Sequence, residues 1–273
     1  MCHAGVMCGR IVIAQAVGDL ADDLDAWDPE ETLLPPRYNV APTSDVPIVL
    51  ERLVPAGSPG TPAAGDPDEE VPVARRELHV ARWGLVPRWA KDLSVSSRAF
   101  NARSETVLEK PTFRSAVKSK RCVVPVDGYY EWCAPAEGKA AKRPFYVHRA
   151  DGEPITFAGL YEWWRDPAVA EGEAGEWVLS CSILTMASPA PDAAGVRGRL
   201  GRLHDRLPIA LPDEEAIAAW LNPVDADAAS LVAMARARAY EATDGWELRE
   251  VGAAVGNVRN DSPALIEPVG SLF

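Results

Sequence analysis

The stretch RCVVPVDGYYEWC at residues 121–133 contains two strand candidates, 121–126 and 129–133, with only Asp127 and Gly128 between them. Valine and aromatic residues dominate both segments, as expected of strands that pack on a half-buried surface. Outward from this stretch, further strand candidates of similar composition lie at 9–13, 46–53, 78–85, 145–148, 155–161, 177–184 and 246–251.

Helices are predicted at 17–26, 105–108, 112–118, 213–221 and 225–240. In the fourth, Asp213 follows Pro212 at the position of an N-cap. Many strands with scattered helices predict an α+β protein: a single compact domain on a curled, mainly antiparallel β-sheet or barrel with flanking helices. The domain is expected to span 7–270. Segments 54–72 and 166–176 are rich in Ala, Gly, Pro and acidic residues, which predicts surface loop insertions.

The composition narrows the class of protein. Of the 273 residues, 47% are hydrophobic, which is enough for a full core and excludes wholesale disorder. The chain has no run of 18 apolar residues and no secretory signal, so neither a membrane partner nor export is expected. Its five cysteines form no CxxC pair, which favours the reducing cytoplasm over a disulfide framework.

Charge is distributed unevenly along the chain. The formal net charge is −12, yet residues 74–121 carry 12 basic and 4 acidic side chains, a local net charge of +8. Phosphate binding depends on the local field, so such a block can bind an anion on an acidic protein. The alternative is a solvated basic face with no binding role.

Five short polar stretches interrupt the apolar pattern: MCGR at 7–10, RYNVAP at 37–42, FNARSE at 100–105, GYYEW at 128–132 and LHDR at 203–206. In the fourth, strand alternation places Glu131 on the face of Tyr129 and Cys133. Crowding by aromatic rings disfavours the charged form, so the pKa of Glu131 is expected to rise toward the range useful for acid–base chemistry. The alternative is an edge-strand carboxylate that points into water.

His204, Asn101 and Arg103 are the other candidates in these stretches. The imidazole of His204 suits proton transfer near neutral pH, although a lone histidine is more often a surface or satisfied core residue. Asn101 can orient a carbonyl-like group and Arg103 can pair with phosphate, whereas an asparagine in a turn usually acts as a cap. The histidines and cysteines have no metal-ligand spacing, and no glycine-rich phosphate loop is present, so neither a metal nor a cofactor is expected.

Together with WGLVP at 83–87, CVVP at 122–125 and AVGNV at 254–258, these stretches resemble the SOS response-associated peptidase family of abasic-site-processing proteins. The resemblance runs from Cys8 to about Pro268. It implies a DNA-damage-response protein, monomeric and associated with the nucleoid, that crosslinks to abasic sites in single-stranded DNA. The implied catalytic residues are Cys8, Asn101, Glu131 and His204. The positions implied to contact DNA or shape the site are Arg10, Asn39, Trp89, Arg103 and Arg206.

The implied chemistry needs cysteine as the first residue. An abasic deoxyribose opens to an aldehyde, which an α-amine of pKa about 7.7–8.0 attacks to form a Schiff base. The thiol on the next carbon then closes a five-membered thiazolidine. Glu131 would move protons during these steps, His204 would protonate the opening sugar ring, and Asn101 would hold the sugar or the cysteine terminus.

The basic block suggests how DNA is held. Three aromatic side chains, those of Trp83, Trp89 and Phe100, are expected to stack on bases without sequence preference. The cations expected to follow the phosphates are Arg98, Arg103, Lys118, Lys120 and Arg121. Family members often carry a second tryptophan after the one that Trp89 matches, and this sequence has Ala90 there.

Six residues precede Met7, and with them attached the nitrogen of Cys8 is an amide that cannot form a thiazolidine. Three interpretations are open. Translation starts at Met7 and 1–6 are an incorrectly assigned start; or 1–6 are a leader removed by autoproteolysis; or Met1 is removed and Cys2 acts instead.

Two rival functions share these residues. The first is a cysteine or N-terminal-nucleophile peptidase that uses Cys8 with His204 and Asn101. The second is a non-enzymatic single-strand-binding module, for which Cys8 is dispensable. Lyase activity by β-elimination is a further open point.

Overall fold

The computed structural model describes residues 9–29, 34–61, 71–134, 141–169, 175–224 and 227–270. The strands are β1 (Ile11–Ile13), β2 (Arg37–Val40), β3 (Asp45–Val54), β4 (Val73–Trp83), β5 (Asn101–Arg103), β6 (Arg121–Val126), β7 (Gly128–Cys133), β8 (Arg143–Arg149), β9 (Ile155–Arg165), β10 (Trp177–Ala187), β11 (Arg206–Pro208) and β12 (Trp246–Glu250). The α-helices are α1 (Val17–Asp23), α2 (Ala116–Ser119), α3 (Gly195–Leu203), α4 (Glu214–Leu221) and α5 (Ala228–Ala242). Short 3₁₀ helices are η1 (Leu93–Arg98), η2 (Thr243–Gly245), η3 (Ala253–Gly256) and η4 (Pro263–Ile266).

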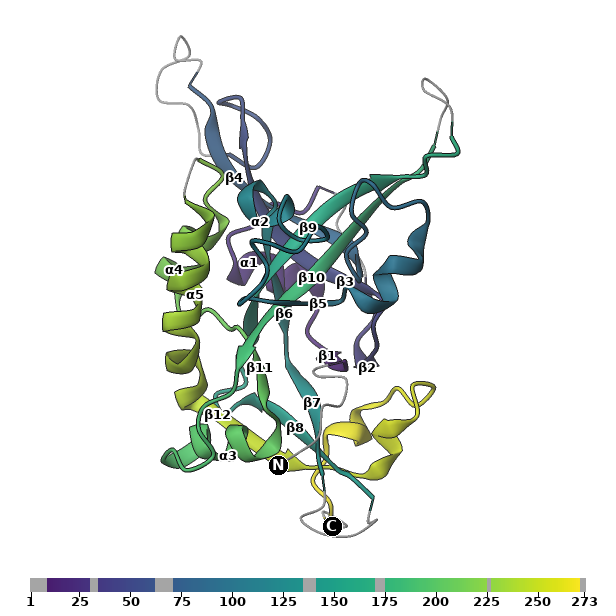
Figure 1. The fold of residues 1–273 in the computed structure, drawn as a ribbon, viewed down its shortest axis with the longest axis vertical. Helices are drawn as coiled ribbons and strands as arrows, with labels where there is room; N and C mark the ends of the chain where they lie inside the picture. The colour runs from purple at the N-terminus through teal and green to yellow at the C-terminus, as the bar shows by residue number, and fades with distance from the viewer. Residues whose placement is uncertain are drawn as a thin grey trace.

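Five strands close into a barrel in the order β10-β4-β3-β6-β9, with β9 pairing back onto β10 (Figure 1). Every pairing in this ring is antiparallel except that of β10 with β4. Successive residues of β3 pack in different hydrophobic clusters. Ile48 packs in one cluster with Trp83, Phe157 and Ile183, and Val49 packs in another with residues of the helices. The first cluster therefore fills the barrel and the second covers its outside.

A second, fully antiparallel sheet has the order β12-β8-β7-β1-β2. Its strand β7 follows β6 of the barrel through Asp127 alone, because β6 ends at Val126 and β7 begins at Gly128. A Cβ atom at Gly128 would lie 2.5 Å from the Val147 carbonyl oxygen and 2.6 Å from the Tyr146 ring. The tight crossing thus requires glycine, and the barrel cluster continues across it to Ile11 and Tyr129 of the second sheet.

Helices α4 and α5 lie side by side along the barrel (Figure 1). Trp220 of α4 is fully buried, and its indole N–H donates to the Cys122 carbonyl at 2.9 Å. Asp213 caps α4 by accepting from the Ala216 N–H at 3.0 Å, which confirms the predicted N-cap. None of the helices in the described ranges has the length and apolar composition needed to span a bilayer.

The α+β class and the barrel-like sheet with flanking helices are confirmed. The helix predicted at 105–108 is wrong: these residues form turns, with Thr106 N–H donating to the Arg103 carbonyl and Glu109 N–H to that of Thr106. The predicted loop insertions fall between β3 and β4 and between β9 and β10, although 62–70 and 170–174 lie outside the described residues.

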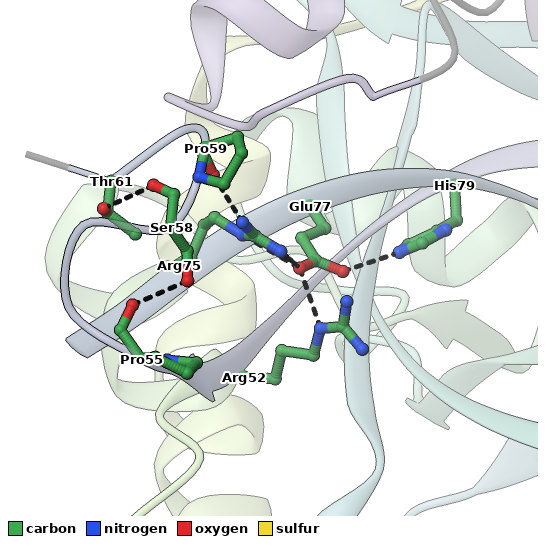
Figure 2. Close-up of polar contacts among 8 residues, drawn as sticks. All are labelled: Arg52, Pro55, Ser58, Pro59, Thr61, Arg75, Glu77 and His79. Atoms are coloured by element: carbon green, nitrogen blue, oxygen red, sulfur yellow. Dashed lines mark hydrogen bonds and ion pairs between the residues drawn. The ribbon is translucent and has the colours of Figure 1, made fainter. Parts of the chain in front are cut away.

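A buried carboxylate ties the β3–β4 hairpin to its surroundings (Figure 2). Glu77 is 1% exposed and accepts hydrogen bonds from Arg52 at 2.7 Å, from Arg75 at 2.9 Å and from His79 at 3.0 Å. Arg75 also donates to the Pro59 carbonyl, and its guanidinium lies 4.0 Å from the centre of the Trp27 ring. Burial by itself would raise the pKa of Glu77, but the hydrogen bonds from Arg75, Arg52 and His79 outweigh it and lower the pKa.

Substituting Glu77→Gln should lower the free energy of unfolding by about 3 kcal/mol at pH 7, because it leaves buried cations without their counter-charge. Since the folded pKa is lowered, this contribution is fully present above the unfolded carboxyl pKa of about 4.3 and is lost as pH falls through the folded value. Urea unfolding between pH 7 and pH 3 measures the difference. Glu250→Gln, at the exposed Arg143–Glu250 pair, should change stability by less than about 0.5 kcal/mol. A gap of equal size at every pH would contradict this account.

Candidate active site

The site lies where β1 of the second sheet runs beside β7. Ile11 pairs with Tyr129 and Val12 with Gly128, and the Tyr130 N–H donates to the Arg10 carbonyl at 2.9 Å. Continuing this register puts Gly9 opposite Glu131. Cys8, the predicted nucleophile, lies outside the described residues. Gly9, which follows Cys8 in the sequence, is the first described residue. Its position opposite Glu131 therefore indicates where the N-terminal segment approaches the site.

Glu131 is buried on a central strand. Its exposed fraction is 4%, and β7 has β1 on one side and β8 on the other. The Trp132 N–H donates to its carboxylate at 3.1 Å. Tyr129 and Cys133, on the same face of β7, belong to or pack against the barrel cluster, as strand alternation predicted. The alternative of an edge-strand glutamate pointing into water is therefore wrong.

Asn101 and Arg103 lie on β5, a short strand that pairs in parallel with the end of β10. The paired residues are Ile183 with Asn101 and Thr185 with Arg103. Asn101 is half-buried and Arg103 is exposed. The other edge of β10 carries β11, so β5 and β11 flank the same end of β10.

His204 ends α3 and is 7% exposed. Its Nδ1 lies 3.0 Å from the backbone nitrogen of Arg206 and 3.0 Å from the carboxylate of Asp205. A backbone N–H can only donate, so in the neutral ring Nδ1 is the acceptor and Nε2 carries the proton. Neutral His204 can therefore act as a hydrogen-bond donor through Nε2.

Arg206 connects the two sides of the site. Its guanidinium forms a two-point ion pair with Glu105, and one of its nitrogens also donates to the Thr185 carbonyl at 2.9 Å. The hydrogen bond from Arg206 lowers the pKa of Glu105. In the sequence, Glu105 is part of the FNARSE stretch and has no evident role. Only the fold identifies it as the counter-ion that holds β5 next to the His204 segment.

Arg10 and Asn39 form a clamp on the C-terminal segment. The Asn39 side chain is 2% exposed; its amide donates to the carbonyls of Val255, Asn257 and Asn260, and its oxygen accepts from Arg10 at 2.9 Å. Arg10 also donates to the Val255 carbonyl at 2.8 Å, and burial lowers its pKa. These contacts give both residues a structural role, and their contact with DNA stays a prediction.

Within the basic block, residues 74–121, most of the exposed cations lie in the segment 88–118. Exposed cations follow the segment 88–118 on both sides of β5, namely Arg88, Lys91, Arg98, Arg103, Lys110, Arg114 and Lys118. Trp89, in the same segment, is 61% exposed, with its indole N–H 3.5 Å from the Pro111 carbonyl. An exposed aromatic ring among cations is a surface suited to a single strand.

Other members of the predicted DNA surface lie inside the protein. Trp83 is fully buried and packs edge-to-face with Phe100, so it cannot stack on a base. Arg121 is buried and donates to the carbonyls of Trp220 and Asn222, and Lys120 pairs with Glu162. The local charge of +8 therefore overestimates the exposed charge, because a sequence count does not separate buried ion pairs from surface cations.

The fold defines an α+β protein with a closed barrel, a second antiparallel sheet that carries the buried Glu131, and an exposed basic segment at 88–118. A sequence model described as SOS response associated peptidase (SRAP) matches residues 7–258, and the chain belongs to this family.

Relatives and a solved structure agree with this placement. The abasic site processing protein YoqW of Bacillus subtilis (strain 168) is 32% identical over 263 residues, which cover 96% of this chain and 99% of that protein. The abasic site processing protein HMCES of Rattus norvegicus is 28% identical, over 91% of this chain and 69% of that protein. A crystal structure of a protein from Bacteroides thetaiotaomicron superposes with a TM-score of 0.69 at 22% identity, over 96% of this chain and 99% of that one, which supports the fold.

The ring state of His204 can be tested directly. Nitrogen-15 NMR of the neutral side chain should show the proton on Nε2 and a lone pair on Nδ1, because the Arg206 N–H occupies Nδ1. Asp205→Asn should leave this tautomer unchanged, since the backbone donor remains. A proton found on Nδ1 would mean that Asp205, and not the backbone, sets the ring.

Proposed function

We propose that this protein processes abasic sites in single-stranded DNA by forming a covalent thiazolidine through Cys8 as its first residue. The observation that carries the proposal is the register of β1 against β7, which puts Gly9, next to Cys8 in the sequence, opposite the buried Glu131. The names of the relatives YoqW and HMCES, both abasic site processing proteins, point to the same lesion.

The reaction needs only the groups of this chain and the sugar. The α-amine of Cys8 adds to the C1′ aldehyde of the opened deoxyribose, and loss of water gives an imine. The thiol sulfur then adds to the imine carbon, its proton passes to the nitrogen, and a thiazolidine ring closes. Imine formation moves a proton from the nitrogen to the departing hydroxyl, and ring closure moves one from the sulfur to the nitrogen, so a buried carboxyl such as Glu131 is suited to relay both transfers.

Glu131, His204 and Asn101 have separate roles in this proposal. Glu131 transfers protons at the cysteine, and His204 delivers a proton to the sugar ring oxygen through its Nε2–H. Asn101 holds the sugar or the cysteine terminus from β5. The exposed cations of 88–118 bind the phosphates and Trp89 stacks on a base, so that the strand crosses the site whatever its sequence.

The proposal requires that residues 1–7 are absent from the active protein. A start at Met7 followed by methionine removal achieves this, and so does autoproteolysis of a leader. The intact mass of the native protein distinguishes these routes from a chain that begins at Cys2.

Cys8→Ser should abolish a heat-stable adduct with abasic single-stranded DNA, because an oxazolidine hydrolyses far more readily than a thiazolidine. Denaturing gels and intact-mass spectrometry measure the adduct. Cys2→Ser is the matched control and should leave it unchanged, while Glu131→Gln should slow its formation without weakening binding to intact strands. A stable adduct in Cys8→Ser would refute the thiazolidine. Peptide turnover without an adduct would favour the peptidase instead.

The salt dependence of binding should come from the segment 88–118. Substituting Arg98, Arg114 and Lys118 by Gln should lower the slope of log Kd against log salt by about 2, given about 0.7 per phosphate contact on a single strand. A control triple, Lys142, Arg149 and Arg238 to Gln, removes the same charge from other surfaces and should leave the slope unchanged. Equal slopes for the two triple variants would contradict the proposed DNA path.

A further inference from the structure

A small apolar pocket adjoins the site. Its floor is formed by Cys133 of β7, Phe145 of β8, Leu248 of β12 and Leu203 of α3, and Arg199 and Arg202 stand at its rim. Cys133 is on the same face of β7 as Glu131, two residues away, and Leu203 directly precedes His204. Two of the pocket residues are therefore close neighbours in the sequence of proposed catalytic residues, which themselves do not line it.

The volume of the pocket, about 160 Å³, suits one aromatic ring. An enclosed apolar cavity of about 150 Å³ in another protein binds benzene. This pocket has a similar volume and an apolar lining but is open to solvent, so a six-membered ring seated in it stays partly exposed. The site residues handle a sugar that has lost its base. The bases that remain in the strand next to that sugar are the aromatic rings nearest to this pocket in the proposed complex.

The rim of the pocket fits a phosphodiester. Helix α3 contains Arg197, Arg199 and Arg202 and no acidic residue. Arg199 donates one hydrogen bond to the Leu248 carbonyl at 2.8 Å, and both Arg199 and Arg202 are exposed. Arginine binds phosphate and also stacks on aromatic rings, so this rim suits a nucleotide better than an apolar side chain.

Two glycines fix α3 in place. A Cβ atom would lie 2.0 Å from the Ala193 carbonyl oxygen at Gly198, and 2.2 Å from the Pro189 carbonyl oxygen at Gly201. The helix therefore packs directly on the backbone of 189–193. The rim arginines project from a helix whose position is set by backbone contact.

From these features we infer that the pocket is a subsite for one nucleobase of the strand, the neighbour of the abasic position, with Arg199 and Arg202 at its phosphate. The inference deepens the proposed function and rests on its single-stranded DNA substrate, but not on the covalent step. It gives this protein a contact that keeps the lesion in register with Glu131 and His204.

The test is a thermodynamic cycle on DNA that cannot react. Three fluorescent single strands are compared, each with one central tetrahydrofuran, which is an abasic analogue without an aldehyde. The first strand keeps all its other bases. The second also lacks the base on the 5′ side of the tetrahydrofuran, and the third lacks the base on its 3′ side. For the wild-type protein, deleting the pocketed base on one of the two sides should weaken binding about tenfold. In Cys133→Phe, whose ring fills the pocket, the same deletion should cost less than twofold.

Leu248→Trp is a second variant that fills the pocket, from β12. It replaces Cys133→Phe in the test if thermal melting shows that Cys133→Phe does not fold. Leu53→Phe, an exposed position on β3, is the matched control and should keep the tenfold effect. An effect of base deletion that is equal in wild-type and filled-pocket proteins, or absent on both sides, overturns the inference. If crosslinking to abasic DNA is absent but filling the pocket still removes the effect of base deletion, only the covalent chemistry is refuted.

Discussion

The antiparallel pairing of β1 with β7 is the contact on which the rest of the site depends. It is short, yet it aligns the start of the described chain with a buried glutamate on a central strand. The one-residue link at Asp127 and the glycine at 128 hold the same sheet against the barrel. One apolar cluster runs across this junction, and Phe100, Leu203 and Cys133, which are sequence neighbours of the candidate polar residues, belong to it or pack against it.

The long elements of the fold were predictable and the short ones were not. The strand at 121–126 was predicted with the bounds of β6, because Val-rich runs and buried strands coincide there. Strands β2, β5 and β11 and helix α3 were missed. Each is short or rich in polar residues, and each exists through pairing or packing with distant parts of the chain, such as β10. Asn39, Asn101 and Arg206 lie on these strands, and His204 follows α3. The local sequence pattern therefore does not predict the secondary structure around the candidate site.

The candidate site residues stand out in the sequence as interruptions of the apolar pattern, but their partners do not. The sequence pointed to Arg206 and Asn39 as DNA contacts. The structure joins Arg206 to Glu105 and Asn39 to three carbonyls of 255–260. The same limit applies to charge. Three arginines of the basic block form contacts within the protein. Arg75 pairs with Glu77, and Arg76 pairs with Glu51 and Glu214. Arg121 donates to helix carbonyls. A residue's partner is a property of the fold, and only its type is visible in one sequence.

The clamp between Arg10 and Val255 joins residues 245 positions apart. During synthesis on the ribosome, the barrel strands emerge long before residues 255–260, so β1 lacks this support until those residues have been made. Contacts of such wide separation form late because closing a long loop has a large entropic cost. In a nascent chain, the strand beside the candidate site therefore gains this support only after the barrel strands have emerged.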